Sequence, residues 1–219
     1  MKKVSRNQMK KNDRGKLERG LSMLRRPFVW LLITLIYGFG CLCYDRKYLV
    51  GKNFDRYHFS IGWQWILQCW ISQKVLGRNR HVPWPVPSCI CVGNPQNIVF
   101  DPDDMSNFHG TGNYFQGIDG KIIIGTGTLI APGSGFINAN HDPAAIKDDI
   151  HLSGKDIILG KCCWIGMGAV VLPGVTLGPG TVVGACSVVT KSFPEGHCVI
   201  AGNPAKKIKV LPYDEETPV

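Results

Sequence analysis

The sequence has no Cys-x-x-Cys pair, although nine of its 219 residues are cysteines, and its six histidines include no His-x4-His pair. A zinc site needs three or four ligands, usually at such short spacings, so we predict no metal. The cysteines are odd in number and mostly alternate with apolar neighbours. This pattern disfavours a disulfide framework and predicts small buried side chains in a reducing compartment.

Acidic residues are nearly absent from the first 26 positions, where ten Lys and Arg stand against Asp13 and Glu18. This basic arm (1–26) supplies +8 of the total charge of +9, so the remainder is almost neutral. An arm of this kind suits nucleic acid or anionic lipid. The apolar sequence that follows favours lipid, and we predict no nucleic-acid partner.

Charge is then absent from residues 27–44, PFVWLLITLIYGFGCLCY. As a helix, its seventeen or so apolar positions reach about 25 Å, slightly short of the roughly 30 Å hydrocarbon core. Basic residues on both flanks, the arm before it and Arg46, Lys47, Lys52 and Arg56 after it, favour cytoplasmic placement of both ends. A re-entrant hairpin or an interfacial segment is therefore favoured over a single crossing, and a signal peptide is the competing interpretation.

The next stretch has the apolar spacing of an amphipathic helix that ends near Gly77. The predicted stripe comprises Trp63, Ile66, Leu67, Trp70 and Ile71. Such a stripe packs either on its own domain or at a membrane interface, and the sequence leaves both open. The proline-rich VPWPVPS that follows marks a boundary near residue 82.

From residue 159 every sixth residue is aliphatic, through Leu159, Ile165, Val171, Leu177, Val183 and Val189, and an earlier run keeps the same step through Ile118, Ile124, Ile130 and Phe136. This period is typical of a hexapeptide β-helix. Each hexad makes a short strand and a turn, three hexads close a triangular coil, and the aliphatic side chains stack inside. The period alone does not give the coil a hand.

The repeat breaks at NANHDP, residues 138–143. The step from Phe136 to Leu159 exceeds the three hexads of one full coil by five positions, which predicts a short loop that leaves the coil. A strand that ends in a loop can hold His141 firmly at a cleft. Transfer of an acyl group from a thioester to a hydroxyl needs a base of near-neutral pKa, which histidine supplies. The alternative is that His141 only caps a strand.

Two blocks, GTLIAPGSGFINANHDP and CWIGMGAVVLPGVTLGPGTVVGACSVVTKSFPEGHCVIAGNPAKKIK, resemble the left-handed β-helix hexapeptide-repeat acyltransferases. The resemblance covers roughly residues 83–209 and is closest to the sugar O-acetyltransferase branch. It implies a homotrimer with sites between subunits, acetyl-CoA as co-substrate, and a sugar acceptor on a cell-surface polysaccharide or its lipid-linked precursor.

The resemblance also assigns individual residues. His141 matches the general base. Asn113 and Asn140 are candidates for acceptor contact, with Gln116 a rival to Asn113, while Asn140, Asp142 or a main-chain carbonyl could orient the His141 ring. The positions that match the CoA channel and its phosphate contacts are Met167, Ala185, Thr190, Lys191, Lys206 and Lys209.

The predicted organisation is a basic arm (1–26), a membrane-associated helical segment (27–82), a mainly β, hexapeptide β-helix domain (83–205) and a C-terminal tail (206–219). The predicted protein is an acetyl-CoA-dependent O-acetyltransferase that contacts the membrane through residues 1–82, at its cytoplasmic face. A non-catalytic membrane-anchored scaffold and an acetyltransferase of a small soluble acceptor, serine or an antibiotic, are the alternatives.

Overall fold

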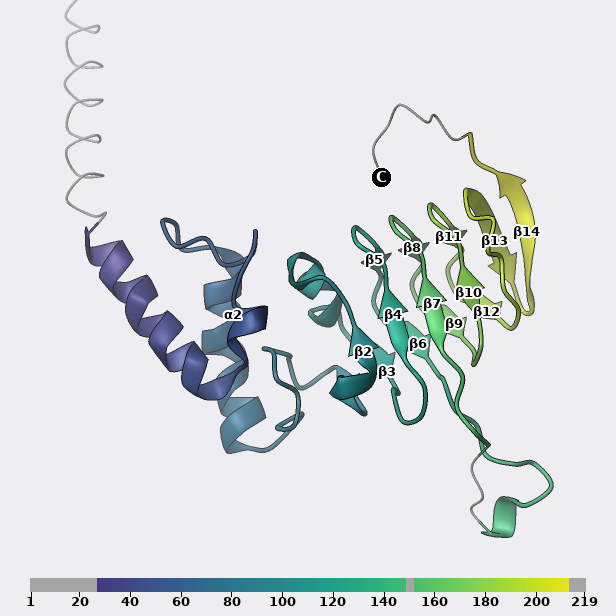
Figure 1. Ribbon diagram of the computed structural model, residues 1–219, viewed down its shortest axis with the longest axis horizontal. Helices are drawn as coiled ribbons and strands as arrows, with labels where there is room; N and C mark the ends of the chain where they lie inside the picture. The colour runs from purple at the N-terminus through teal and green to yellow at the C-terminus, as the bar shows by residue number, and fades with distance from the viewer. Residues whose placement is uncertain (1–26, 149–151, 213–219) are drawn as a thin grey trace, which may run out of the picture.

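The computed structural model describes residues 27–148 and 152–212, which form a helical module followed by a three-sided coil of short strands (Figure 1). The predicted basic arm, residues 1–26, lies outside the described residues, as does the end of the predicted tail beyond residue 212. The division into domains at the predicted boundaries stays a prediction.

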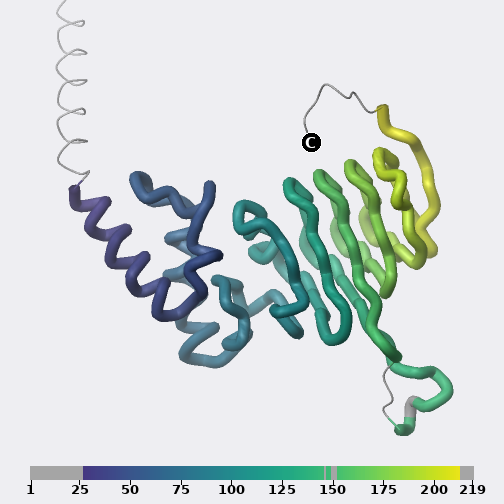
Figure 2. The backbone as a smooth tube through the Cα atoms, viewed as in Figure 1, coloured from purple at the N-terminus to yellow at the C-terminus, as the bar shows by residue number. Residues whose placement is uncertain are grey.

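The chain winds through a row of stacked turns (Figure 2). These turns form three sheets, and from β3 to β12 successive strands pass from one sheet to the next. The first sheet has the order β1 (Cys91–Val92), β3 (Tyr114–Phe115), β6 (Gly135–Phe136), β9 (Val170–Val171), β12 (Val188–Val189). The second has the order β10 (Thr176–Leu177), β7 (Ile157–Leu159), β4 (Ile122–Ile124), β2 (Ile98–Val99). The third has the order β14 (Ala205–Val210), β13 (Cys198–Gly202), β11 (Val182–Val183), β8 (Trp164–Ile165), β5 (Leu129–Ile130).

The strand pairs within these sheets are parallel, except that β13 and β14 pair antiparallel. Trp164 lies opposite Val182, the equivalent position three hexads later, so three hexads make one coil. The prediction of a parallel coil of hexads is confirmed, and all six positions from Leu159 to Val189 are buried.

Two parts of the sequence prediction are wrong. Ile118 is 52% exposed and is not a core position, because the chain from Gln116 to Gly120 forms a turn rather than a strand. The loop after Phe136 is also longer than predicted. Leu159 belongs to the next face of the coil, so the step from Phe136 to Leu159 replaces a single hexad, and nearly three hexads of chain are inserted there.

Close contact between successive coils explains the glycine that often follows the buried aliphatic residue. A Cβ on Gly160 would lie 2.6 Å from the backbone nitrogen of Pro179 in the next coil. Any side chain there would push the two coils apart, so the position requires glycine.

The helical module contains a helix over residues 27–43, η1 (Arg46–Tyr48), α2 (Ile61–Trp70) and a π-helical turn, η2 (Ile71–Val75). The predicted second helix is confirmed, and Gly77 follows its end with a φ of +82°. The predicted stripe is only half right. Trp63 and Ile66 are fully buried, but Leu67 and Ile71 are exposed, because the buried face is rotated toward Trp65 and Cys69.

The cysteine prediction also needs correction. Cys69, Cys163 and Cys198 are buried as expected. Four others are exposed, namely Cys89, Cys91, Cys162 and Cys186.

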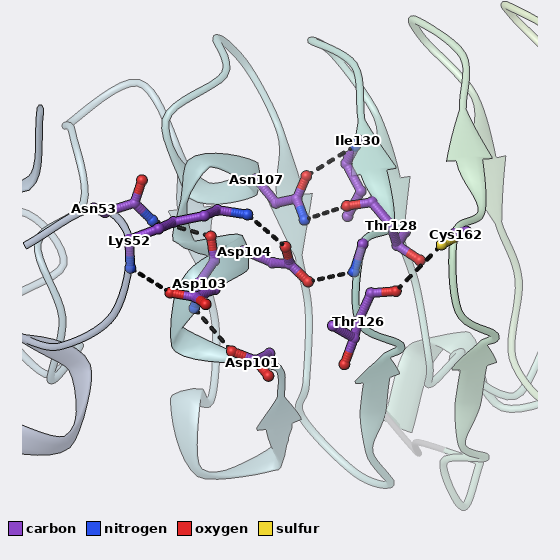
Figure 3. Close-up of polar contacts among 11 residues, drawn as sticks. Lys52, Asn53, Asp101, Asp103, Asp104, Asn107, Thr126, Thr128, Ile130 and Cys162 are labelled. Carbon is purple, nitrogen blue, oxygen red and sulfur yellow. Dashed lines mark hydrogen bonds and ion pairs between the residues drawn. The ribbon is translucent and has the colours of Figure 1, made fainter. Parts of the chain in front are cut away.

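Polar side chains join the module to the first coils through η4 (Pro102–Phe108) (Figure 3). The Lys52 amide donates to the Asp103 carboxylate at 2.6 Å. The buried Asp104 carboxylate accepts from the Gly127 amide at 2.7 Å and lies 3.6 Å from the Lys52 ammonium. The Asn107 side chain accepts a hydrogen bond from the Ile130 amide and donates one to the Thr128 carbonyl. It therefore provides hydrogen-bond partners for backbone groups at the open edge of β5.

The remaining short helices are η3 (Pro95–Asn97) and η5 (Ile146–Asp148).

His109, at the end of η4, stacks on Trp65 of α2 with ring centroids 3.9 Å apart. Burial lowers the pKa of His109 from 6.5 to about 4. A hydrogen bond with the Pro85 backbone acts in the opposite direction and is the smaller effect. Its Nε2 is buried without a hydrogen-bond partner, so the folded protein holds a neutral ring at this contact.

We expect this histidine to make stability fall with pH below neutrality. The unfolded chain binds a proton on His109 below about pH 6.5, whereas the folded chain does so only near pH 4, so acid favours unfolding across that window. The effect at pH 5 is roughly 2 kcal/mol. Denaturant titrations at pH 7.5 and pH 5 measure the difference in the free energy of unfolding. A His109→Phe variant keeps a stacked ring but cannot bind this proton, so its difference should be smaller by about that amount. An unchanged pH dependence in the variant would contradict the assignment.

Candidate functional site

The chain leaves the coil as a loop between β6 and β7 (Figure 1). His141 lies at the base of this loop, and its side chain is exposed. Two backbone hydrogen bonds close this base. The Lys155 amide donates to the Asn138 carbonyl, and the Leu152 amide donates to the Asn140 carbonyl, both at 2.8 Å. The exposed Asn140 therefore lies at the second of these ties, and His141 is the next residue beyond it.

The turn after β3 braces both stems of the loop. The Gln116 Oε1 accepts from the backbone amides of Asn138 and Ala139, each at 2.9 Å. The Asp119 carboxylate accepts from the Gly154 amide at 2.7 Å, and the buried Asn138 amide group donates to the Asp119 carbonyl at 2.5 Å. The stems are thus fixed by side chains of the preceding coil before His141 is reached.

Gln116 is therefore a positioning residue, a role that its place in the sequence does not predict. We expect Gln116→Ala to leave two amides of the His141 stem without their acceptor, which costs about 1–3 kcal/mol of local order. The turnover number should fall several-fold while the KM for the acetyl donor changes little. Gln116→Glu keeps an acceptor oxygen and serves as the matched rescue variant. Equal losses in both variants would contradict a positioning role.

Asn113 lies in the interior of the coil. Its side chain is 1% exposed, its Oδ1 accepts from the Ser134 amide at 3.0 Å, and its amide group lies 3.4 Å from the Asn107 carbonyl. These bonds hold adjacent turns of the coil together. Its contact with an acceptor stays a prediction.

Met167 and Ala185 lie at the same corner of the coil, between the third sheet and the first. The Cys186 amide donates to the Met167 carbonyl at 2.8 Å, so these turns stack directly on each other. Both side chains are exposed. The structure therefore brings together two of the predicted CoA positions.

Thr190 and Lys191 follow β12 at the next corner, between the first sheet and the second. The His141 loop leaves the coil at this same kind of corner, two coils earlier. Both side chains are exposed. The predicted base thus shares this edge of the first sheet with Thr190 and Lys191, whereas Met167 and Ala185 lie at the opposite edge.

Lys206 and Lys209 are exposed residues of β14. In a regular strand, residues three apart point to opposite faces. Here the register with β13 shifts, so Lys206 pairs with Ala201 and Lys209 pairs with Val199. Because Ala201 and Val199 share a face of β13, the bulge places both lysines on one side of the sheet.

Lys207 differs from these two lysines, because it forms an ion pair with Glu195. That hydrogen bond raises the pKa of Lys207 and lowers the pKa of Glu195. Both groups lie at the surface. The pair ties β14 to the turn before β13.

Among the described residues, no three His, Cys, Asp or Glu side chains are grouped so that they could hold a metal ion. A cavity of about 710 Å³ lies where the module meets the first coil, lined by Lys47, Tyr48, His81, Asn94 and other residues. None of the predicted site residues lines it. The predicted base and the predicted CoA residues are instead exposed at the surface of the coil.

The family description "Bacterial transferase hexapeptide (six repeats)" matches residues 156–191. WcaF of Escherichia coli K12, named as a colanic acid biosynthesis acetyltransferase, is 40% identical over 90 residues, which cover 41% of this chain and 48% of WcaF. A chloramphenicol acetyltransferase of Klebsiella aerogenes is 36% identical over 116 residues, 44% of this chain and 54% of that protein. YJL218W of Saccharomyces cerevisiae, named as an acetyltransferase, is 33% identical over 135 residues, 55% of this chain and 67% of that protein. The chain thus spans about half the length of the first two relatives and two thirds of the third.

Proposed function

The chain belongs to the bacterial transferase hexapeptide family, and from this premise we propose that it is an O-acetyltransferase that moves an acetyl group from acetyl-CoA to a sugar hydroxyl. The proposed acceptor is a cell-surface polysaccharide or its lipid-linked precursor. The observation that carries the proposal is the exposed His141 at the braced base of a long insertion in the coil.

His141 acts as the general base in the proposed reaction. The acceptor hydroxyl oxygen attacks the thioester carbonyl carbon while its proton passes to the imidazole. The tetrahedral intermediate then collapses, the carbon–sulfur bond breaks, and the imidazolium returns the proton to the departing CoA thiolate. Backbone amides of a neighbouring coil are the proposed donors to the oxyanion. The thioester is already activated, so no nucleophile of the protein is required.

CoA binds along the outer surface in this proposal. Its pantetheine arm follows the exposed corner that Met167 and Ala185 share, with Thr190 at the next corner. The phosphates contact Lys206 and Lys209, which the bulge in β14 places on one side. Lys191, at the corner after β12, is a further candidate for contact with CoA. A lysine contributes there as a point charge.

A second subunit completes the site in this proposal. The residues assigned to the base and to CoA are exposed, and they lie at two corners of the coil and on β14. A left-handed coil packed as a homotrimer, as the resemblance of the sequence implies, supplies the missing wall. The exposed Asn140, next to His141, is the candidate contact with the acceptor.

The likeness to WcaF supports a polysaccharide acceptor, because that relative is named for the biosynthesis of colanic acid. The likeness to a chloramphenicol acetyltransferase supports a small soluble acceptor as the second candidate. Acetyl-CoA is cytoplasmic, so we place the reaction at the cytoplasmic face of the membrane.

The test is the release of CoA from acetyl-CoA by the full-length protein with four acceptors in parallel. These are extracted host polysaccharide, lipid-linked sugar, chloramphenicol and serine, with hydrolysis in the absence of acceptor as the blank. Release that depends on one of the first two supports the proposal. Release only with chloramphenicol or serine would replace the acceptor class. No release with any acceptor, together with no binding of acetyl-CoA, would show a non-catalytic scaffold.

A further inference from the structure

The helix over residues 27–43 has apolar side chains on two different faces. One face packs on the module, with Ile33 and Ile36 buried and Gly40 so close to α2 that a Cβ would lie 2.7 Å from the Ile66 side chain. The other face points outward. It is a stripe at helical spacing, Phe28, Leu31, Leu35 and Leu42, with exposed fractions from 51% to 86%.

The exposed apolar side chains concentrate in the module rather than in the coil. Of the 22 large hydrophobic residues that are exposed in the described chain, 14 lie between residues 28 and 76. Those of the second helical segment include Leu67, Ile71 and Val75. Such a concentration of exposed apolar side chains is typical of an interaction surface.

Charge identifies the kind of partner. Between residues 45 and 80 the module has seven Lys and Arg against Asp45 and Asp55, a net charge of +5. Residues 81–212 have eight Lys and Arg against nine acidic residues, a net charge of −1. The outward stripe itself contains no charged residue. An apolar stripe on a module of net positive charge matches acyl chains beneath anionic headgroups.

Aromatic and cationic side chains gather at the start of this helix. A groove of about 560 Å³ is lined by Pro27, Trp30, Tyr57 and His58. The Arg56 guanidinium lies nearby, 5.2 Å from the centre of the Tyr37 ring. Tryptophan, tyrosine and arginine are the side chains that suit the boundary between headgroups and acyl chains.

We propose that the outward stripe of residues 27–43 is an interfacial docking surface that lies in the plane of an anionic lipid membrane. The opposite face of the helix stays on α2, so the module remains folded while it rests on the lipid. Within residues 27–148 and 152–212, no helix is long and apolar enough to cross a membrane. The inference does not depend on the proposed function, because lipid binding is measured without acetyl-CoA or acceptor.

The test is sedimentation of the full-length protein with phosphatidylcholine vesicles, with and without phosphatidylglycerol. The variant Leu31→Gln, Leu35→Gln, Leu42→Gln changes only exposed side chains of the stripe. Its partition into the vesicles should fall at least about tenfold. The matched control carries Val99→Gln, Ile118→Gln and Leu129→Gln, three exposed apolar residues of the coil, and should bind like the unmodified protein.

High salt distinguishes lipid binding by the apolar stripe from charge attraction by the basic arm. At about 0.5 M NaCl the Debye length is roughly 4 Å, so charge attraction is largely screened and the stripe should still hold a fraction of the protein on the vesicles. Quenching of Trp30 fluorescence by brominated lipid, measured against Trp30→Phe, is a second readout that does not depend on the leucine variant. No vesicle binding, equal binding of both triple variants, or a loss of oligomer size instead of lipid binding in the stripe variant would overturn the proposal.

Discussion

Replacement of His141 by alanine is expected to lower acceptor-dependent release of CoA by about 10²–10⁴-fold in kcat/KM, because the attacking hydroxyl loses its general base. A hundredfold loss corresponds to about 2.7 kcal/mol of transition-state stabilisation. His141 is exposed beyond the tied stems of its loop, so the fold should not depend on its ring. Steady-state rates over a range of acceptor concentrations, with acetyl-CoA saturating, measure the effect.

The matched control for this variant is His58→Ala. His58 is also an exposed histidine, and it pairs with the Asp55 carboxylate at 2.7 Å on the helical module, on a different element from the candidate site. Its replacement should leave kcat/KM unchanged. Binding of acetyl-CoA and the melting temperature should be the same in both variants. A His141→Ala protein that keeps full activity would remove His141 from the mechanism.

Replacement of Phe136 by alanine is expected to destabilise the protein by about 3–5 kcal/mol. The Phe136 side chain is fully buried, and its ring stacks on that of Phe115 in the preceding coil with centroids 5.1 Å apart. The whole stability of a domain is only about 5–15 kcal/mol, so the variant should unfold at a much lower denaturant concentration.

Leu129→Ala is the comparison that tests the register of the coil. Leu129 also lies in a strand of the coil, but its side chain is 61% exposed, so its loss should cost no more than about 0.5 kcal/mol. The free energy of unfolding from denaturant titrations measures both. Equal destabilisation by the two replacements would mean that the hexad core is assigned to the wrong face.

The hexad period identified the core of the coil but could not identify the sheet on which each hexad falls. A period of six gives the same signal on all three faces. The gap from Phe136 to Leu159 therefore fits either a full coil with a short loop or a single hexad with a long loop, and only pairing across sheets separates the two. The prediction that Ile118 is a core residue was wrong for a related reason, because a residue in phase with the repeat can still lie in a turn.

The histidine of the loop was predictable, but the residues that hold it were not. Gln116 and Asp119 stand more than one coil before the stems that they brace, and a polar residue in a turn has no special spacing. The bulge that places Lys206 and Lys209 on one face is likewise a property of strand pairing. Such contacts arise only when the chain folds.

The antiparallel strand β14 decides where the coil stops. A column of parallel coils could in principle accept a further coil, or a second molecule, at each open end, and so grow into a fibre. At one end of the third sheet, β14 pairs with β13 in the opposite direction. At the other end, the side chain of Asn107 in η4 forms hydrogen bonds with the backbone at the edge of β5. Within the described residues, both ends of the third sheet are therefore covered, which disfavours end-to-end polymerisation through this sheet.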